Sequence, residues 1–119
     1  MKKTLVLGAS LKPSRYSNLA VNRLVDNDIE TEAFGLRDGE IRGVPIKTDF
    51  DDFENIHTIT LYVGARHQSE YTDEILRLQP ERVIFNPGTE NPELYDILKK
   101  NGIEVEVACT LVLLGTGQF

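Results

Sequence analysis

Short apolar runs that alternate with helix-like patterns are the feature that most constrains the fold of this chain. Aliphatic, β-branched and aromatic residues gather at 4–7, 31–36, 57–63, 82–85 and 103–107, and such runs predict strands. The first run stops at Gly8, as a strand buried on both faces of a parallel sheet would. Helical patterns separate most of these runs, which predicts crossover connections between parallel strands.

Three stretches between the runs have helical spacing. The first follows a cap expected at Ser14 or Ser17, and the second covers residues 71–79 and is closed by Pro80. The third is the clearest, with Asn91 as its cap and Pro92 at its first position. We therefore predict an α/β fold of Rossmann-like, three-layer type, in which a five-stranded, mostly parallel sheet carries helices on both faces.

Residues 37–53 do not follow this alternation. Gly39, Gly43 and Pro45 separate only a few apolar residues there, and glycine and proline are the strongest local breakers of regular structure. We expect a long, irregular connection with one turn of helix near Asp51.

Composition narrows the class of protein. The 119 residues are 40% hydrophobic, which suffices for one core, so we expect a single domain over residues 1–119. A net charge of −6 argues against general nucleic-acid binding, which needs clustered Lys and Arg. The chain has one cysteine, and its first apolar run is too short for a secretion signal. Its apolar runs also fall short of the roughly 20 residues of a membrane helix. These features predict a cytoplasmic protein that does not bind membranes.

Ligands of open parallel sheets bind beyond the carboxyl ends of the strands. Five cations fall in the first three loops expected at that edge: Lys12, Arg15, Arg37, Arg42 and Arg66. A local basic cluster in an acidic protein indicates an anionic ligand.

The segment from Gly8 to Arg15 is the strongest candidate site. It joins a buried strand to a helix, so its backbone N–H groups and the helix N-terminus can face a phosphate. The alternative is a simple strand-ending turn. Arg37 follows the second strand, where it suits a phosphate on a ribose or lies in solvent, and Arg66 with His67 could meet a pyrophosphate or be solvated.

Catalytic patterns are poor. Cys109 is the single cysteine, and the two histidines are distant from it in sequence. A thiol at the end of a strand is more often a small buried hydrophobe than a nucleophile. The acidic residues from Asp49 to Glu54 lack metal-ligand spacing, so we expect neither a catalytic residue nor a metal site.

The sequence resembles the small stand-alone CoA-binding proteins, which are similar to the CoA-binding part of succinyl-CoA synthetase α subunits. The resemblance is carried by Gly8-Ala9-Ser10, residues 12–17, Gly39-Glu40-Ile41 with Gly43, and a terminal strand that carries Cys109. It implies that coenzyme A or an acyl-CoA binds through its ADP portion. The residues that it places at this cofactor are Gly8, Ala9, Ser10, Lys12, Arg15, Arg37, Val63 and Arg66.

Three functions follow as hypotheses. The leading one is CoA binding without catalysis of its own. The alternatives are a small NADP-dependent oxidoreductase, for which the glycine fingerprint is missing, and a nucleotide-sensing interaction module. The expected partner is therefore a nucleotide cofactor, and the apolar residues Leu111 to Leu114 form a candidate homodimer surface unless they fold back on the core.

Overall fold

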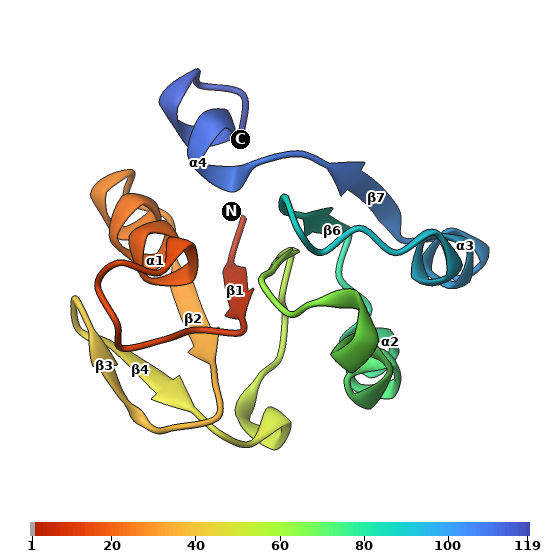
Figure 1. The fold of residues 1–119 in the computed structure, drawn as a ribbon, viewed down its shortest axis with the longest axis horizontal. Coiled ribbons are helices and arrows are strands. Elements are labelled where there is room, and N and C mark those ends of the chain that lie inside the picture. Colours follow the sequence, from red (N-terminus) through yellow and green to blue (C-terminus); the bar gives the residue numbers. More distant parts are fainter. Residues whose placement is uncertain (1) are drawn as a thin grey trace.

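A computed structural model describes residues 2–119 and consists of a seven-stranded sheet with helices packed against it (Figure 1). The strand order is β3-β4-β2-β1-β5-β6-β7. The strands are β1 (Thr4–Leu7), β2 (Thr31–Phe34), β3 (Gly39–Ile41), β4 (Val44–Lys47), β5 (Thr58–Leu61), β6 (Arg82–Phe85) and β7 (Glu104–Val107). All neighbouring strands pair in parallel except β3 and β4, so the predicted α/β class and parallel sheet are confirmed.

The sheet has seven strands rather than the predicted five because residues 37–53 contain a hairpin. β3 and β4 pair antiparallel and are joined by Arg42 and Gly43, with φ of 53° and 82°. Two consecutive positive φ values match the right-handed twist of a two-residue hairpin. β3, which begins with Gly39, is the edge strand, and Pro45 of β4 precedes the residues of β4 that pair with β2, so its missing N–H breaks no ladder bond to β2. The expected helical turn near Asp51 is present as a 3-10 turn at Phe50–Asp52.

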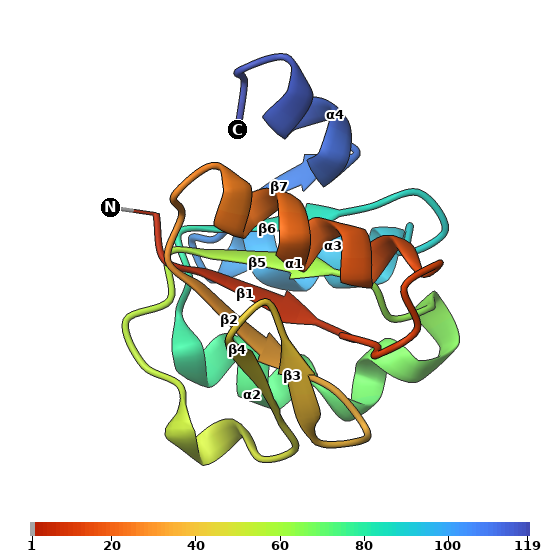
Figure 2. The same ribbon diagram turned by 90° about the vertical axis from the view of Figure 1, so that its left-hand side faces the viewer.

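The helices are α1 (Tyr16–Asp26), α2 (Thr72–Leu78), α3 (Pro92–Lys100) and α4 (Thr110–Gly115), and they cover both faces of the sheet. Val6 and Ala33 pack with Val21 and Leu24 of α1 on one face. On the other face a larger cluster includes Ile75 of α2 and residues of α3. Figure 2 shows α1 and α4 above the sheet and α2 below it.

The helix boundaries confirm one sequence prediction and correct another. Asn91 caps α3, as predicted, because its side-chain oxygen accepts from the Leu94 N–H at 3.4 Å and Pro92 is the first helical residue. The cap of α1, however, is Arg15 and not Ser14 or Ser17. Arginine has no acceptor, so it cannot satisfy the first N–H groups of that helix.

Residues 110–114 are helical, so the prediction of a terminal strand that carries Cys109 is wrong. Cys109 precedes α4, which contacts α1, with Leu113 buried and Leu114 packed against the core. The chain then ends with the Phe119 carbonyl accepting from Arg82 Nη2 at 2.9 Å. Most of this apolar run therefore folds back on the core. Over residues 2–119, none of the helices has the length and apolar character needed to cross a membrane.

Candidate functional site

A cleft of about 960 Å³ lies at the carboxyl ends of β1, β2 and β5. This edge is where open parallel sheets bind their ligands. Three parts of the chain line it, namely the loop after β1 with the first residues of α1, the loop after β2, and the segment after β5: Gly8 to Lys12, Arg15 to Ser17, Phe34 to Arg37, Tyr62 to Gly64, and His67, Glu70 and Tyr71.

Seven of the eight predicted site residues line this cleft: Gly8, Ala9, Ser10, Lys12, Arg15, Arg37 and Val63. Arg66 does not line it. Its Nε donates to the ring of the neighbouring His67 at 3.3 Å, and His67 itself lines the cleft. Arg42, which the sequence grouped with these cations, does not line the cleft and pairs with Asp26, the last residue of α1, at 2.9 Å.

Two glycines let the three loops approach one another. Gly8 has a φ of 103°, and a Cβ added to it would lie 3.0 Å from the Tyr62 carbonyl carbon. A Cβ on Gly35 would lie 2.5 Å from the Ala9 carbonyl oxygen. Side chains at either position would force the strand ends apart, so glycine here sets the floor of the cleft.

Part of the loop after β1 is held by hydrogen bonds within the protein. The N–H groups of Gly8 and Ala9 both donate to the Phe34 carbonyl, at 2.9 and 2.8 Å. The buried Asn18 side chain donates to the Ser10 carbonyl at 2.9 Å, and the Lys12 N–H donates to Ser10 Oγ at 3.2 Å. The amides of Gly8 and Ala9 are therefore occupied, and a ligand must find its donors farther along the loop and at α1.

The beginning of α1 is open toward the cleft. Arg15 makes no side-chain cap, the first turn contains no acidic residue, and Tyr16 and Ser17 line the cleft. A helix of 11 residues carries a partial positive charge at its N-terminus, together with N–H groups that have no partner inside the helix. Such an end favours an anion.

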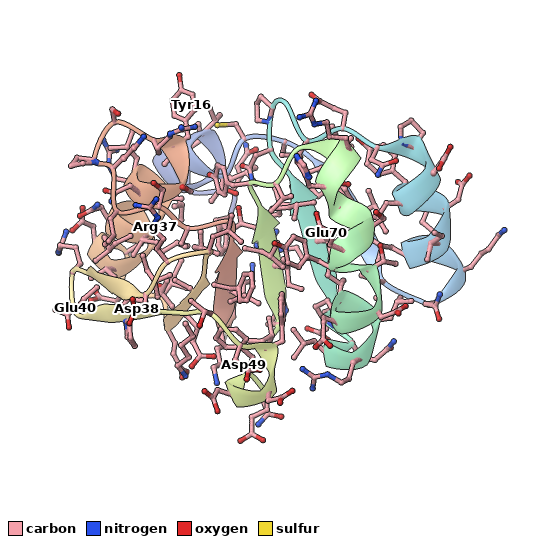
Figure 3. The ribbon with its side chains drawn as sticks, turned by 60° about the horizontal axis from the view of Figure 1, so that its bottom comes forward. Tyr16, Arg37, Asp38, Glu40, Asp49 and Glu70 are labelled. Carbon is pink, nitrogen blue, oxygen red and sulfur yellow. The ribbon has the colours of Figure 1, made fainter. Side chains whose placement is uncertain are left out.

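Three cations surround this helix end. Lys12, Arg15 and Arg37 are exposed and line the cleft, and within residues 2–119 none of them forms a salt bridge. Glu70 is the only carboxylate among the lining residues, so the cleft is positive on the side of α1 and the loop after β2. Figure 3 shows Arg37 and Glu70 apart from one another, on either side of the strand ends.

Exposed apolar side chains border the same cations, and sequence reasoning missed them. Leu36 is 85% exposed, Tyr16 is 71% exposed and Leu11 is 46% exposed, and all three line the cleft. Leu11 also packs on Gly39, where an added Cβ would lie 2.7 Å from Leu11 Cδ1. Leu11 and Leu36 lie in loops and Tyr16 begins α1, and none of them carried a signal in the sequence, because single exposed apolar residues are common and only the fold brings these together.

The far end of the cleft is aromatic and acidic. Phe34, Glu70 and Tyr71 line the cleft and also a second cavity of about 260 Å³, which adds Phe50 and further polar residues. The rings of Phe34 and Tyr71 lie 5.5 Å apart, edge to face. Burial, followed by the charge of Glu70, raises the pKa of the Tyr71 phenol.

Tyr62 lines the cleft and also packs against the core on the α1 face, and its hydroxyl group is buried. That oxygen is inaccessible and has no hydrogen-bond partner among residues 2–119. Burial raises the pKa of Tyr62 to about 12. The phenol is therefore neutral at physiological pH, and Tyr62 adds no charge to the cleft.

Two side-chain amides, of the buried Gln68 and the half-buried Asn91, fix the opposite wall of the cleft. Gln68 Nε2 donates to the carbonyls of Val63 at 2.8 Å and Thr89 at 2.7 Å, and Asn91 donates to Gln68 Oε1 at 2.9 Å. Gln68 is 1% exposed, so this bridge is shielded from water. It ties the segment after β5, which lines the cleft, to the loop after β6.

Cys109 lies at the start of α4, is only half-buried, and belongs to neither cavity. Over residues 2–119, no group of three His, Cys, Asp or Glu side chains is arranged to hold a metal ion. The chemistry that this cleft offers is binding of an anion with an attached apolar or aromatic group.

The comparisons with known proteins agree with this geometry. The family described as a CoA binding domain matches residues 2–115. A crystal structure of an uncharacterized protein is 46% identical, with a TM-score of 0.96, and the match covers 100% of this chain and 98% of that one. The comparison with curated proteins finds no match.

Two further solved structures share the fold at lower identity. Cell-free ID.343 from Thermus thermophilus is 24% identical with a TM-score of 0.86, over 99% of this chain and 90% of that one. A dinucleotide-forming acetyl-coenzyme A synthetase from Ca. Korarchaeum cryptofilum, in complex with phosphate and ADP, is 16% identical with a TM-score of 0.72. That match covers 87% of this chain and 25% of the synthetase.

Proposed function

The chain belongs to the CoA-binding domain family, and on that premise we propose that its cleft binds coenzyme A or an acyl-CoA. The observation that carries the proposal is the open N-terminus of α1, which lies among three unpaired cations at the carboxyl edge of the sheet. Both features suit a diphosphate, because backbone N–H donors and positively charged side chains can bind different oxygens of the same group.

Each part of the cleft has a role in this proposal. The diphosphate lies against the loop from Ser10 to Arg15 and the first turn of α1, with Lys12 and Arg15 as its counter-charges. Gly8 and Ala9 allow the close approach without donating their own amides. Arg37 meets the phosphate on the ribose, Val63 flanks the nucleotide, and Arg66 contributes only long-range charge from outside the cleft.

Binding rather than catalysis is the function that we propose. Neither cavity contains a cysteine, and the one histidine of the cleft, His67, is paired with Glu70 at 3.4 Å on the surface. The side-chain amides of Gln68 and Asn91 bond to other groups of the protein and so position the wall rather than a reacting atom.

Isothermal titration calorimetry with CoA, acetyl-CoA, NADPH, NADH and AMP tests the proposal, with thermal unfolding as a second readout. We expect saturable binding of CoA or acetyl-CoA. At a ligand concentration 100 times the Kd, the free energy of unfolding rises by about 2.7 kcal/mol. For a domain of this size the melting temperature then rises on the order of 10 °C.

Preferential binding of NADPH would contradict the proposal and support the oxidoreductase hypothesis. Absence of binding for all five ligands would indicate that the loop after β1 is a structural turn. Lys100→Ala is the matched control for variants that remove a cation of the cleft. It removes an exposed cation at the end of α3 that lines neither cavity, so CoA affinity should not change.

A further inference from the structure

Glu70 carries a negative charge in a cleft that we propose binds a polyanion, so its presence there requires an explanation. It is the only carboxylate that lines the main cleft, and it lies across the strand ends from Arg37 (Figure 3). Its partner within the protein is His67, with 3.4 Å between the ring Nδ1 and the carboxylate Oε2, and both side chains are more than half exposed. A carboxylate facing a phosphorylated ligand costs binding energy unless a hydrogen-bond donor of that ligand meets it.

The surroundings of Glu70 fit one part of a nucleotide. Phe34 and Tyr71 provide aromatic surface, and the second cavity continues from them between the end of β4 and α2. That cavity adds Asp49, Asp51 and Glu74, so it repels phosphate. The end of the cleft that Glu70 occupies therefore suits an uncharged aromatic group that carries an amine.

The position of this end along the ligand follows from the sheet order. Phe34 is the last residue of β2, and Arg37 lies in the loop that follows it. Thr48 and Asp49 follow β4, which is the next strand outward from β2. In the proposed function Arg37 meets the ribose phosphate, so the base of the same nucleotide lies within reach of Phe34 and of the second cavity, across the strand ends from Arg37.

Resting on the proposed function, we infer that Glu70 determines base specificity by accepting a hydrogen bond from the exocyclic amine of adenine. A carboxylate is an acceptor only, so it pairs with an amine and repels the carbonyl oxygen that hypoxanthine has at the same position. Because the Glu70 side chain is more than half exposed, water satisfies the carboxylate when the amine is missing, so the discrimination is limited to about the value of one hydrogen bond to a charged group.

The test compares the dissociation constants of CoA and of deamino-CoA, in which hypoxanthine replaces adenine, by calorimetry. For the wild-type protein we expect CoA to bind about tenfold more tightly, the effect of one hydrogen bond to a charged group in a partly exposed site. In Glu70→Ala this ratio should fall to about 1. In Glu70→Gln, whose amide can also donate, deamino-CoA should bind at least as well as CoA.

Glu54→Gln is the control, because Glu54 is an exposed carboxylate that lines neither cavity, and it should keep the tenfold ratio. Equal affinity of the wild-type protein for both ligands would overturn the inference and leave the proposed function standing. A ratio unchanged in Glu70→Ala would overturn it as well. Failure of the wild-type protein to bind CoA at all would overturn both proposals.

Discussion

Two loops of this sheet occupy equivalent positions. The protein supplies hydrogen-bond partners and a helix cap for one of them and leaves the helix end of the other uncapped. Residues 8–15 join β1 to α1, and residues 86–91 join β6 to α3, so each leads from the carboxyl end of a parallel strand into a helix. In the second loop the protein supplies its own partners. Asn91 caps α3, and Glu93 adds a negative charge to the first turn of that helix.

Asn86 completes the closure of the second loop. Its amide donates to Thr60 Oγ1 at 2.8 Å and to the Leu61 carbonyl at 2.9 Å, and its oxygen accepts from the Thr110 N–H at 2.8 Å. Thr89 Oγ1 donates to the Asn86 carbonyl at 2.7 Å. Polar groups of this loop are thus satisfied from within the protein.

The first loop ends at a helix with no cap and no acid, surrounded by cations. The difference teaches that the topology makes both loops candidates for anion binding, and that the side chains decide which of them remains open. Changes in the closed loop should therefore alter stability, and changes in the open loop should alter binding.

The largest effect is expected for Asn86→Ala. Three hydrogen bonds of a side chain that is 1% exposed are lost, and their partners stay buried. We expect the free energy of unfolding to fall by about 3 kcal/mol, measured by urea denaturation. The affinity of the folded protein for CoA should change less than threefold. A loss below about 1 kcal/mol would contradict the account of the closed loop.

The double variant Lys12→Ala/Arg37→Ala should show the reverse pattern. Each cation is exposed, so we discount its contact with phosphate for solvent screening and expect about a tenfold loss of CoA affinity per residue, or about 100-fold together. Stability should change by less than about 0.5 kcal/mol. Calorimetry and urea denaturation measure the two quantities, and unchanged affinity would show that these cations are merely solvated.

Arg15→Asp tests whether the uncapped N-terminus of α1 lowers the stability of the protein and raises its affinity for the ligand. Arg15 has φ −77° and ψ 142°, the conformation of an N-cap, and aspartate can accept from the first N–H groups of α1. We expect CoA affinity to fall about tenfold and the free energy of unfolding to rise by about 0.5–1 kcal/mol. A decrease of both quantities would contradict this interpretation.

The smallest effect is expected for Asn91→Ala, which removes the cap of α3 and the bond to Gln68. Loss of an N-cap costs about 1 kcal/mol of stability. Urea denaturation measures this loss, and CoA affinity should stay within about twofold, because Asn91 lines neither cavity. A loss of affinity larger than the loss of stability would show that the closed loop also binds the ligand.

The sequence predicted the elements whose local signals agree with their packing. β1 and β6 lie where the apolar runs placed them, and α3 begins at its predicted cap. The hairpin of β3 and β4 was missed because Arg42, an ordinary L residue, adopts a positive φ that no sequence pattern marks. α4 was missed because a short apolar run does not distinguish helix from strand.

The positive side of the cleft was predictable and the acidic side was not. Lys12, Arg15 and Arg37 lie in loops that follow strands in sequence, so the rule for parallel sheets brings them together. Glu70 and Tyr71 come from a 3-10 segment at Ala65–Glu70 and the residue after it, and they reach the cleft only through the packing of Tyr71 against Phe34 and Phe50. Such tertiary contacts have no periodic signal in the sequence.

A crystal structure of the protein with CoA tests the central claim most directly. The account predicts the diphosphate at the beginning of α1, with its oxygens about 3 Å from N–H groups between Ser10 and Ser17. It also predicts no phosphate at residues 86–91. A diphosphate bound at the loop after β6, or bound away from α1, would contradict the distinction between the open and the closed loop.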